Sequence, residues 1–348
     1  MKRLFAISVF FGLTATAALQ GPAVSTDSLN FSWMVPAVSG TINYGNPHPS
    51  SIRPVADVDL TAEGDPTVAA RTGPDRTPSW GRYSLSGFGE SPYIVRPAKS
   101  GTLNNFITSF DAAKISQHVI GREFLDSSQR IAADTSGNGT IQSYDAALIA
   151  AYVVNSPLGH GLTGTWIFNP GNRAYPFVIT DITGQDYTAF LLGEVSGNWN
   201  NNGGGGGGNR SANEMDEAIN LSVEEPALKT HVRSGVVVPV IVQNIKDKGV
   251  ISYQFELRYD PNVIQPIANS VGLVGTVSRG LSFAVNTSDP GVLRVAVYGA
   301  EPITQDGVLL NLKFKAVGAT DSDAALYFEN VMFNESDAYV STTVAKID

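Results

Sequence analysis

The chain has 348 residues, of which 43% are hydrophobic, and this is enough for two or three packed domains. A formal net charge of -9 and the absence of a Lys/Arg cluster exclude nucleic acid as an expected partner, because phosphate binding needs a basic surface. The absence of cysteine excludes disulfides, thiolate chemistry and cysteine-ligated zinc, so core packing or a hard cation must stabilise any small domain.

The first 20 residues, MKRLFAISVFFGLTATAALQ, have the three parts of a secretory signal peptide. Two basic residues precede an apolar run from Leu4 to Leu13, and Ala15 and Ala17 supply the small residues of a cleavage site. A transmembrane anchor is the alternative, but the apolar run is short for ~30 Å of hydrocarbon. We therefore expect a signal peptide over residues 1–20, no membrane span, and a mature chain that is secreted, either extracellular or at the cell surface.

Residues 39–99 contain short β-type runs, such as VADVDLTA, GRYSLSGF and PYIVRPA, which are separated by Pro, Gly and Asn. This pattern predicts a small antiparallel β-sandwich of roughly 60 residues.

Residues 100–155 contain an internal repeat, in which SGTLNNFITSFDAAKISQHVI (100–120) aligns with DTSGNGTIQSYDAALIAAYVV (134–154). Each copy is an oxygen-rich loop followed by an apolar helical pattern. In the second copy the buried stripe of that helix is expected to contain Leu148, Ile149, Tyr152 and Val153. The segment therefore predicts two loop-plus-helix units.

The spacing of the oxygen-bearing residues in each copy suits a calcium loop, which supplies ligands from positions 1, 3, 5, 7, 9 and 12 and turns sharply at position 6. In the second loop these ligand positions hold Asp134, Ser136, Asn138, the carbonyl of Thr140, Gln142 and Asp145, with Gly139 at position 6. In the first loop they hold Ser100, Thr102, Asn104, the carbonyl of Phe106, Thr108 and Asp111. The first loop has one carboxylate against two, so we expect it to bind Ca²⁺ weakly or only to keep its shape. The alternative for either loop is an Asx-turn followed by an N-capped helix.

Residues 156–199 mix a strand or two with a turn of helix, and no sequence rule assigns them firmly. The next segment, NNNGGGGGGNRSANE (200–214), is a flexible linker by composition.

Residues 219–348 then contain many short β-branched runs with no intervening helix, which predicts a second β-sandwich. Alternation along YQFELRY places Tyr253, Phe255, Leu257 and Tyr259 on one face of a strand. The predicted fold class is therefore multidomain and mainly β, with a small α-helical calcium-loop module between two β-sandwiches.

Three family resemblances follow from these patterns. The two loop-plus-helix repeats, with Asp at position 12 and no entering helix before either loop, resemble a type I dockerin. Residues 219–348 resemble a cohesin, a nine-stranded jelly-roll sandwich that binds dockerins, through SGVVVPVIVQNI, YQFELRYDPNVI and GVLLNLKFKAVG. Residues 39–99 are similar to transthyretin-like or carboxypeptidase-regulatory-like surface domains, and residues 156–199 would then be an extension of the dockerin.

The dockerin resemblance implies Ca²⁺ as cofactor and other secreted proteins with dockerin or cohesin modules as partners. It also implies a partner-binding role for loop positions 10 and 11, which are Ser109 and Phe110 in the first copy and Ser143 and Tyr144 in the second. The alternative is that Phe110 and Tyr144 are core aromatics that pack one repeat on the other.

We find no G-x-S-x-G, P-loop or H-E-x-x-H motif, and the four histidines are scattered, so we expect a non-catalytic protein. The interpretation is a modular protein for calcium-dependent docking, plausible in an extracellular polysaccharide-degrading assembly. The alternative is a carbohydrate-binding or surface-adhesion module, with polysaccharide as partner, although the C-terminal segment has no Trp.

A docking module and its receptor in one chain would close on itself or polymerise if the two were cognate. Neither suits a secreted adaptor. We therefore expect non-cognate modules, with the dockerin-like segment bound to another protein or packed on the N-terminal sandwich, and the cohesin-like domain open to a different dockerin.

Overall fold

The computed structural model describes residues 35–46, 52–100, 105–201, 219–223, 235–317, 324–335 and 345–347. The predicted signal peptide, Thr102, Asn104 and all but two residues of the predicted linker lie outside these ranges. The chain divides into two compact units, Met1–Val35 and Pro36–Asp348, and the elements below belong to the second. Within the described ranges no helix combines the length and apolar character that a membrane crossing requires.

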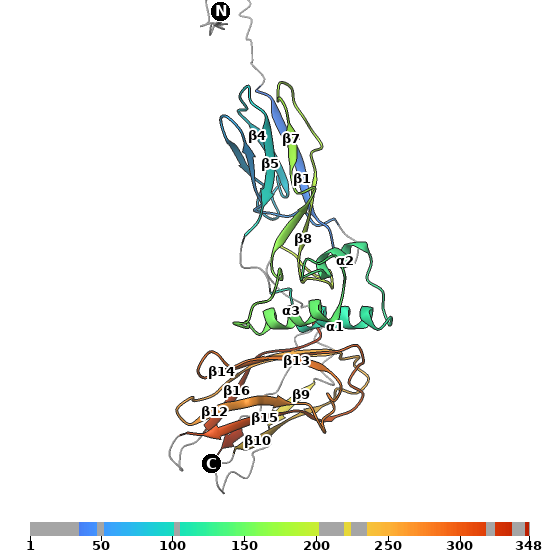
Figure 1. Cartoon of the computed structure of the whole chain (residues 1–348), viewed down its shortest axis with the longest axis vertical. Coiled ribbons are helices and arrows are strands. Elements are labelled where there is room, and N and C mark those ends of the chain that lie inside the picture. The colour runs from blue at the N-terminus through green and yellow to red at the C-terminus, as the bar shows by residue number, and fades with distance from the viewer. Residues whose placement is uncertain are drawn as a thin grey trace, which may run out of the picture. The chain divides into compact units, whose positions relative to one another are not determined.

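The N-terminal β region consists of two four-stranded sheets (Figure 1). The first has the order β4-β1-β8-β6, from the strands Arg82–Ser86, Ala37–Tyr44, Tyr187–Leu191 and Trp166–Asn169. The second has the order β3-β2-β5-β7, from the strands Val68–Arg71, Asp59–Glu63, Tyr93–Ala98 and Arg173–Tyr175.

These two sheets do not close within residues 39–99, where the sequence predicted a complete sandwich. Strand β8 pairs in parallel with β1, with Ile42 opposite Tyr187, and β7 extends the other sheet beyond β5. The segment 156–199 therefore contributes three strands to the N-terminal β region. The sequence indicated a strand or two here but could not place them, because they are short and because β8, YTAFL, is buried almost throughout and so shows no alternation.

An aromatic cluster fixes the end of this segment to the N-terminal sheet. Trp199 is fully buried, and its ring centroid lies 4.8 Å from that of Tyr44 in β1 and 5.0 Å from that of Trp166 in β6. Aromatic pairs at such distances favour tilted and edge-to-face geometry, as seen here. The backbone from Gly193 to Trp199, called the strap below, is thereby held beside the helices.

Three helices lie between the two halves of the N-terminal β region in sequence: α1 (Ser109–Val119), α2 (Ser127–Ala133) and α3 (Ser143–Val153). The two repeat helices, α1 and α3, are the predicted ones and pack on each other. In α3, Leu148 and Ile149 are buried as expected, whereas Tyr152 and Val153 are only partly buried.

Helix α2 contradicts the expectation that no helix enters either loop, because it ends directly before Asp134. Its start is capped by Asp126, whose carboxylate accepts hydrogen bonds from the backbone N–H groups of Ser128 (2.8 Å) and Gln129 (2.9 Å). It was missed because it has only seven residues, SSQRIAA, too few for a helical period to stand out.

The C-terminal segment forms a β-sandwich, with nine strands among its described residues. One sheet has the order β12-β15-β10-β9, from the strands Ile264–Gly272, Gly307–Ala316, Val236–Gln243 and Asn220–Val223. The other has the order β13-β14-β11-β16-β17, from the strands Ser282–Asn286, Val292–Tyr298, Ser252–Arg258, Ala324–Phe333 and Ala345–Ile347. The predicted alternation is confirmed, since Tyr253, Phe255, Leu257 and Tyr259 all join the core between the sheets.

Candidate functional site: two loops and their helices

The second loop is organised by two carboxylates. Asp134 accepts hydrogen bonds from the backbone N–H of Asn138 (3.0 Å, to Oδ1) and of Gly139 (2.9 Å, to Oδ2). Asp145, buried at the start of α3, accepts from the N–H of Ser136 (2.9 Å, to Oδ1) and of Gln142 (2.9 Å, to Oδ2). Ser136 joins the two acids, because its hydroxyl also donates to Asp134 at 3.4 Å. The loop thus brings its first and last predicted ligands to one residue.

The sharp turn of this loop falls where the calcium pattern requires it. Gly139, at position 6, has φ of 79°, a conformation that L side chains rarely adopt. Asn138 Oδ1 accepts from the N–H (2.8 Å) and the hydroxyl (2.7 Å) of Thr140, and Gln142 donates to that hydroxyl at 3.1 Å. All six predicted ligand residues of the second loop are therefore described and close in space.

The donor set of the second loop fits calcium. It offers carboxylate, hydroxyl, amide and carbonyl oxygens and no nitrogen or sulfur, as a hard cation prefers. An ionised carboxylate has about four lone-pair sites. Asp145 uses two of them on backbone N–H groups, which leaves two for a cation. Within the described ranges no three side chains of His, Cys, Asp or Glu come together at a metal-binding spacing, so any calcium here would depend on the neutral oxygens as well.

The first loop is held differently, through the single carboxylate of Asp111. This side chain is fully buried, and its Oδ2 accepts from the N–H (2.8 Å) and hydroxyl (3.3 Å) of Thr108. Its Oδ1 accepts from two N–H groups of the strap, those of Val195 (2.8 Å) and Ser196 (2.9 Å). All four lone-pair sites of Asp111 are thus occupied by donors of the protein. Ser100 is exposed, and the side chain of Phe106 is fully buried in the core.

The strap and its buried acid, Glu194, were not expected from the sequence. Glu194 is fully buried, and its Oε1 accepts from the Ser196 hydroxyl (2.9 Å) and from the N–H groups of Gly197 (2.6 Å) and Asn198 (2.9 Å). Its Oε2 accepts a hydrogen bond from the Tyr44 hydroxyl. The sequence signal was present in the two glycines of GEVSGNW, both of which have positive φ. The two glycines indicate tight turns, whereas the burial of the Glu between them has no signal in the sequence.

Burial dominates the electrostatics of this region. It raises the pKa of Asp111 and that of Glu194 above the ordinary carboxyl range, although the hydrogen bonds to each favour the charged form. For Glu194 the negative charge of Asp111 raises the pKa further. Burial also raises the pKa of Glu335, which follows β16 and senses the charge of Asp111 as well. Three acids around the first loop therefore hold their protons more tightly than free carboxyls.

The predicted contact residues of the two repeats occupy unlike surroundings. Ser109 is fully buried, and Phe110 is partly buried against the core with the Lys114 ammonium 5.6 Å from its ring centroid. Ser143 is exposed, and Tyr144 is 60% exposed. Tyr144 is thus not a core aromatic, whereas Phe110 is a partial one.

Helices α1 and α3 contact the C-terminal sandwich. Helix α1 lies against β11 and β14, and α3 lies against β13 and β14. We expected the helical repeats and this sandwich to be non-cognate; the structure instead places the helices on its five-stranded sheet.

Comparison with known proteins assigns two of these regions. The family model of the Dockerin type I domain matches residues 102–154, and that of the Cohesin domain matches residues 222–346. The chain therefore carries a dockerin type I domain followed by a cohesin domain, and cohesin and dockerin modules imply protein docking. Neither match reaches the N-terminal strands. A search of curated proteins gave no match.

Solved structures similar to this chain include cohesins. A cohesin of scaffoldin B from Acetivibrio cellulolyticus, in complex with a mutant dockerin, is 24% identical over 38% of this chain and 98% of its own, with a TM-score of 0.33. A type I cohesin–dockerin complex from Clostridium thermocellum is 19% identical over 38% of this chain and 99% of its own, with a TM-score of 0.33. A cohesin from Clostridium acetobutylicum is 26% identical over 38% of this chain and 90% of its own, with a TM-score of 0.30.

Proposed function

We propose that the chain is a secreted, non-catalytic docking protein in which Ca²⁺ orders the second loop of the dockerin and thereby sets the position of helix α3. The observation that carries the calcium part is the arrangement of Asp134 and Asp145 around Ser136, with lone pairs left on Asp145. A cation between the two acids would offset their mutual repulsion at the start of the helix. The polysaccharide-degrading setting is part of the same proposal and follows from the family alone.

The proposal assigns the two loops different tasks. The second loop is the calcium loop, with Asp134, Ser136, Asn138, Thr140, Gln142 and Asp145 as its ligands. The start of α1 keeps its arrangement without needing the ion, because the strap already supplies donors to Asp111. The N-terminal strands serve as the frame that carries the strap.

Thermal unfolding of the full chain with chelator and with millimolar calcium tests the calcium part. Sites with dissociation constants of ~10⁻⁴–10⁻³ M would raise the free energy of unfolding by about 0.4–1.4 kcal/mol at 1 mM calcium. An unchanged melting temperature would leave the second loop as an Asx-turn before a capped helix. For the docking part, a type I dockerin or cohesin from a second protein is passed over the immobilised chain. The docking part would be contradicted if neither module binds and the chain's own dockerin and cohesin make no contact in solution.

A further inference from the structure

The five-stranded sheet of the cohesin has an outward face that is buried. Along β14, Leu293, Val295 and Val297 point into the sandwich core, so Arg294, Ala296 and Tyr298 point outward. Yet Ala296 is fully buried and Tyr298 is only 7% exposed. Tyr298 belongs to the same buried cluster as the residues of α1 and α3, not to the core of its own sandwich. The helices of the dockerin therefore cover this face.

The face of the sheet under the helices carries small side chains. Ala284 in β13 and Ala296 in β14 are paired across the strands, and Gln254 in β11 continues the same row. Ala284 packs against the cluster that contains the helices. Two alanines side by side let a helix approach a sheet closely, and dispersion contacts are gained along the whole row.

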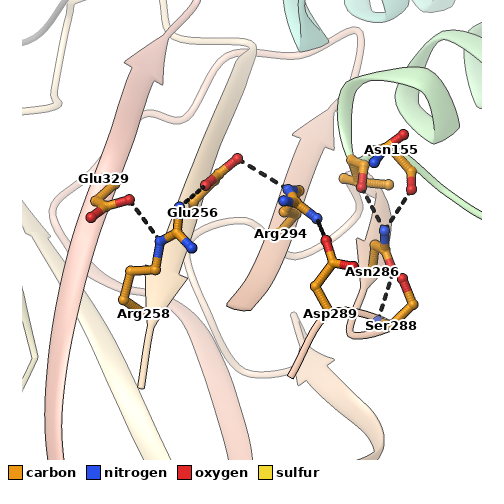
Figure 2. A network of polar contacts seen from close by, with 9 residues as sticks. Asn155, Glu256, Arg258, Asn286, Ser288, Asp289, Arg294 and Glu329 are labelled. Carbon is orange, nitrogen blue, oxygen red and sulfur yellow. Dashed lines mark hydrogen bonds and ion pairs between the residues drawn. The ribbon is translucent and has the colours of Figure 1, made fainter. Parts of the chain in front are cut away.

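The cohesin also caps both helices. The N–H of Ser109, at the start of α1, donates to Gln254 Oε1 at 2.8 Å. At the end of α3, the side-chain amide of Asn286 donates to the carbonyls of Val154 (2.9 Å) and Asn155 (2.6 Å), as Figure 2 shows. Helix ends leave N–H and C=O groups without partners inside the helix. An oxygen at the N-terminus and a donor at the C-terminus are also the signs that the helix dipole favours.

Further contacts extend along α1 and beyond it. The side chain of Gln117 donates to the carbonyl of Ala300 at 3.3 Å, and Arg122 forms an exposed ion pair with Glu301. Near the end of α3, the charges of the cohesin sheet are paired among themselves, from Glu329 through Arg258, Glu256 and Arg294 to Asp289 (Figure 2). The contact thus leaves none of these five charges without an opposite charge.

Chain connectivity favours a contact within one molecule. The described residues Asn201 and Ile219 are joined by residues 202–218, most of them in the Gly-rich segment. By composition, a Gly-rich chain of this length spans on the order of 20 Å, which corresponds to an effective concentration near millimolar. A dockerin from another molecule would have to compete with that concentration.

We propose that the ligand of this cohesin face is the dockerin of the same chain, so that the protein is closed on itself and offers neither surface fully to a second protein. This inference rests on the proposed docking function and identifies the docking partner of the cohesin as the dockerin of the same chain. Foreign dockerins would bind only as fast as the internal contact opens.

Cross-linking of the full chain tests the proposal. The protein has no cysteine, so the double variant Arg122→Cys/Glu301→Cys carries the only two thiols, on residues that form an exposed ion pair of little energetic weight. Unlabelled and heavy-isotope-labelled chains are mixed in equal amounts in calcium and treated with a short bis-maleimide. Mass spectrometry of the linked peptides should then find pairs of one isotope only. Mixed pairs at about half of the total, or no linked peptides, would overturn the proposal.

Two controls sharpen the result. Arg122→Cys/Lys315→Cys carries its second thiol on the exposed face of the other sheet and should give at least fivefold less internal cross-link. Asn286→Asp, added to the first pair, sets a carboxylate against the carbonyls of Val154 and Asn155 and should lower the yield several-fold. Asn262→Asp, the same change in a loop of the sandwich, should not. An equal cross-link yield in the Asn286→Asp and Asn262→Asp variants would contradict the contact between dockerin and cohesin. Loss of the stabilisation by calcium, with the cross-links intact, would contradict only the proposed function.

Discussion

The two repeats hold the carboxylate at the start of their helices by different means. In the first, Asp111 is fully buried and receives four donors from the protein, two of them from the strap. In the second, Asp145 receives two, and Asp134 lies in a loop whose tip is exposed. Two oriented N–H groups of a neighbouring segment can therefore take the place that a cation has in a calcium loop. The first repeat is thus held by contacts within the fold, whereas for the second we propose that Ca²⁺ supplies the further contacts.

The largest effect should come from breaking the first repeat. Asp111→Ala leaves the N–H groups of Thr108, Val195 and Ser196 buried without an acceptor, and each such group costs ~1–3 kcal/mol. We expect a loss of about 3 kcal/mol or more in the free energy of unfolding, measured by denaturant titration in chelator. The matched variant Asp126→Ala, which removes a helix cap, should lose about 1 kcal/mol. Similar losses for both would mean that the strap contacts carry no weight.

The pH dependence of stability should separate the repeats next. Burial raises the pKa of Glu194 to about 8, so the folded chain holds this proton longer than the unfolded chain does. Stability should therefore fall as the pH rises from the ordinary Glu value of ~4.3 toward 8, with a slope of up to 1.36 kcal/mol per pH unit for one proton. Glu194→Gln should reduce this slope, with Asp111 and Glu335 leaving a remainder. Melting curves at several pH values between ~5 and ~8, inside the window over which this proton is lost, check it, and an unchanged slope in Glu194→Gln would refute the assignment.

The stabilisation by calcium should depend on the second repeat, whereas the effects above depend on the first. Asp134→Ala should remove most of the gain of about 1 kcal/mol that millimolar calcium gives to the wild-type chain, because it takes one of the two charges from the second loop. Asp126→Ala, an acid eight residues away outside the loop, should keep the full gain. The measurement is the difference in melting temperature between calcium and chelator for each variant. A full gain in Asp134→Ala would place the ion elsewhere.

The smallest effect should be found at the two aromatic positions. Tyr144→Ala should change the free energy of unfolding by no more than about 0.5 kcal/mol, since Tyr144 is 60% exposed. Phe110→Ala should cost about 1–2 kcal/mol, because Phe110 is partly buried against the core and lies near Lys114. Chemical denaturation of both variants in calcium checks this ranking. Equal costs would mean that the repeats bury these rings alike.

The parts of the fold that sequence could predict are those with a strong local period. The 3.6-residue pattern located α1 and α3, and alternation along β11 assigned Tyr253 and Phe255 to the core. The parts that it could not predict depend on distant partners. Strand β8 exists as a strand because β1 and β6 lie on either side of it, and its own residues show no period.

The candidate site divides in the same manner. The ligand spacing of the second loop is local, so Asp134 and Asp145 could be named from sequence and do lie together around Ser136. The strap could not be paired with Asp111 from sequence, since 84 residues separate Asp111 from Val195. The buried state of Ser109 likewise depends on Gln254, on the far side of the linker. The spacing of residues predicts the ligands that one segment can supply, whereas burial depends on which distant segments pack against it.

The parallel pairing of β1 with β8 has a mechanical consequence. The chain leaves the N-terminal sheets after β5, forms the helices and returns at β6, so the dockerin is tied to the same β structure at both of its ends. A pulling force between the start of β1 and the residues after β8 would act along two neighbouring parallel strands, whose backbone hydrogen bonds over the paired segments Ile42–Tyr44 and Tyr187–Ala189 would resist together in shear. Tension along the polypeptide would then bypass residues 105–154, and the helices would keep their arrangement while the protein is under strain.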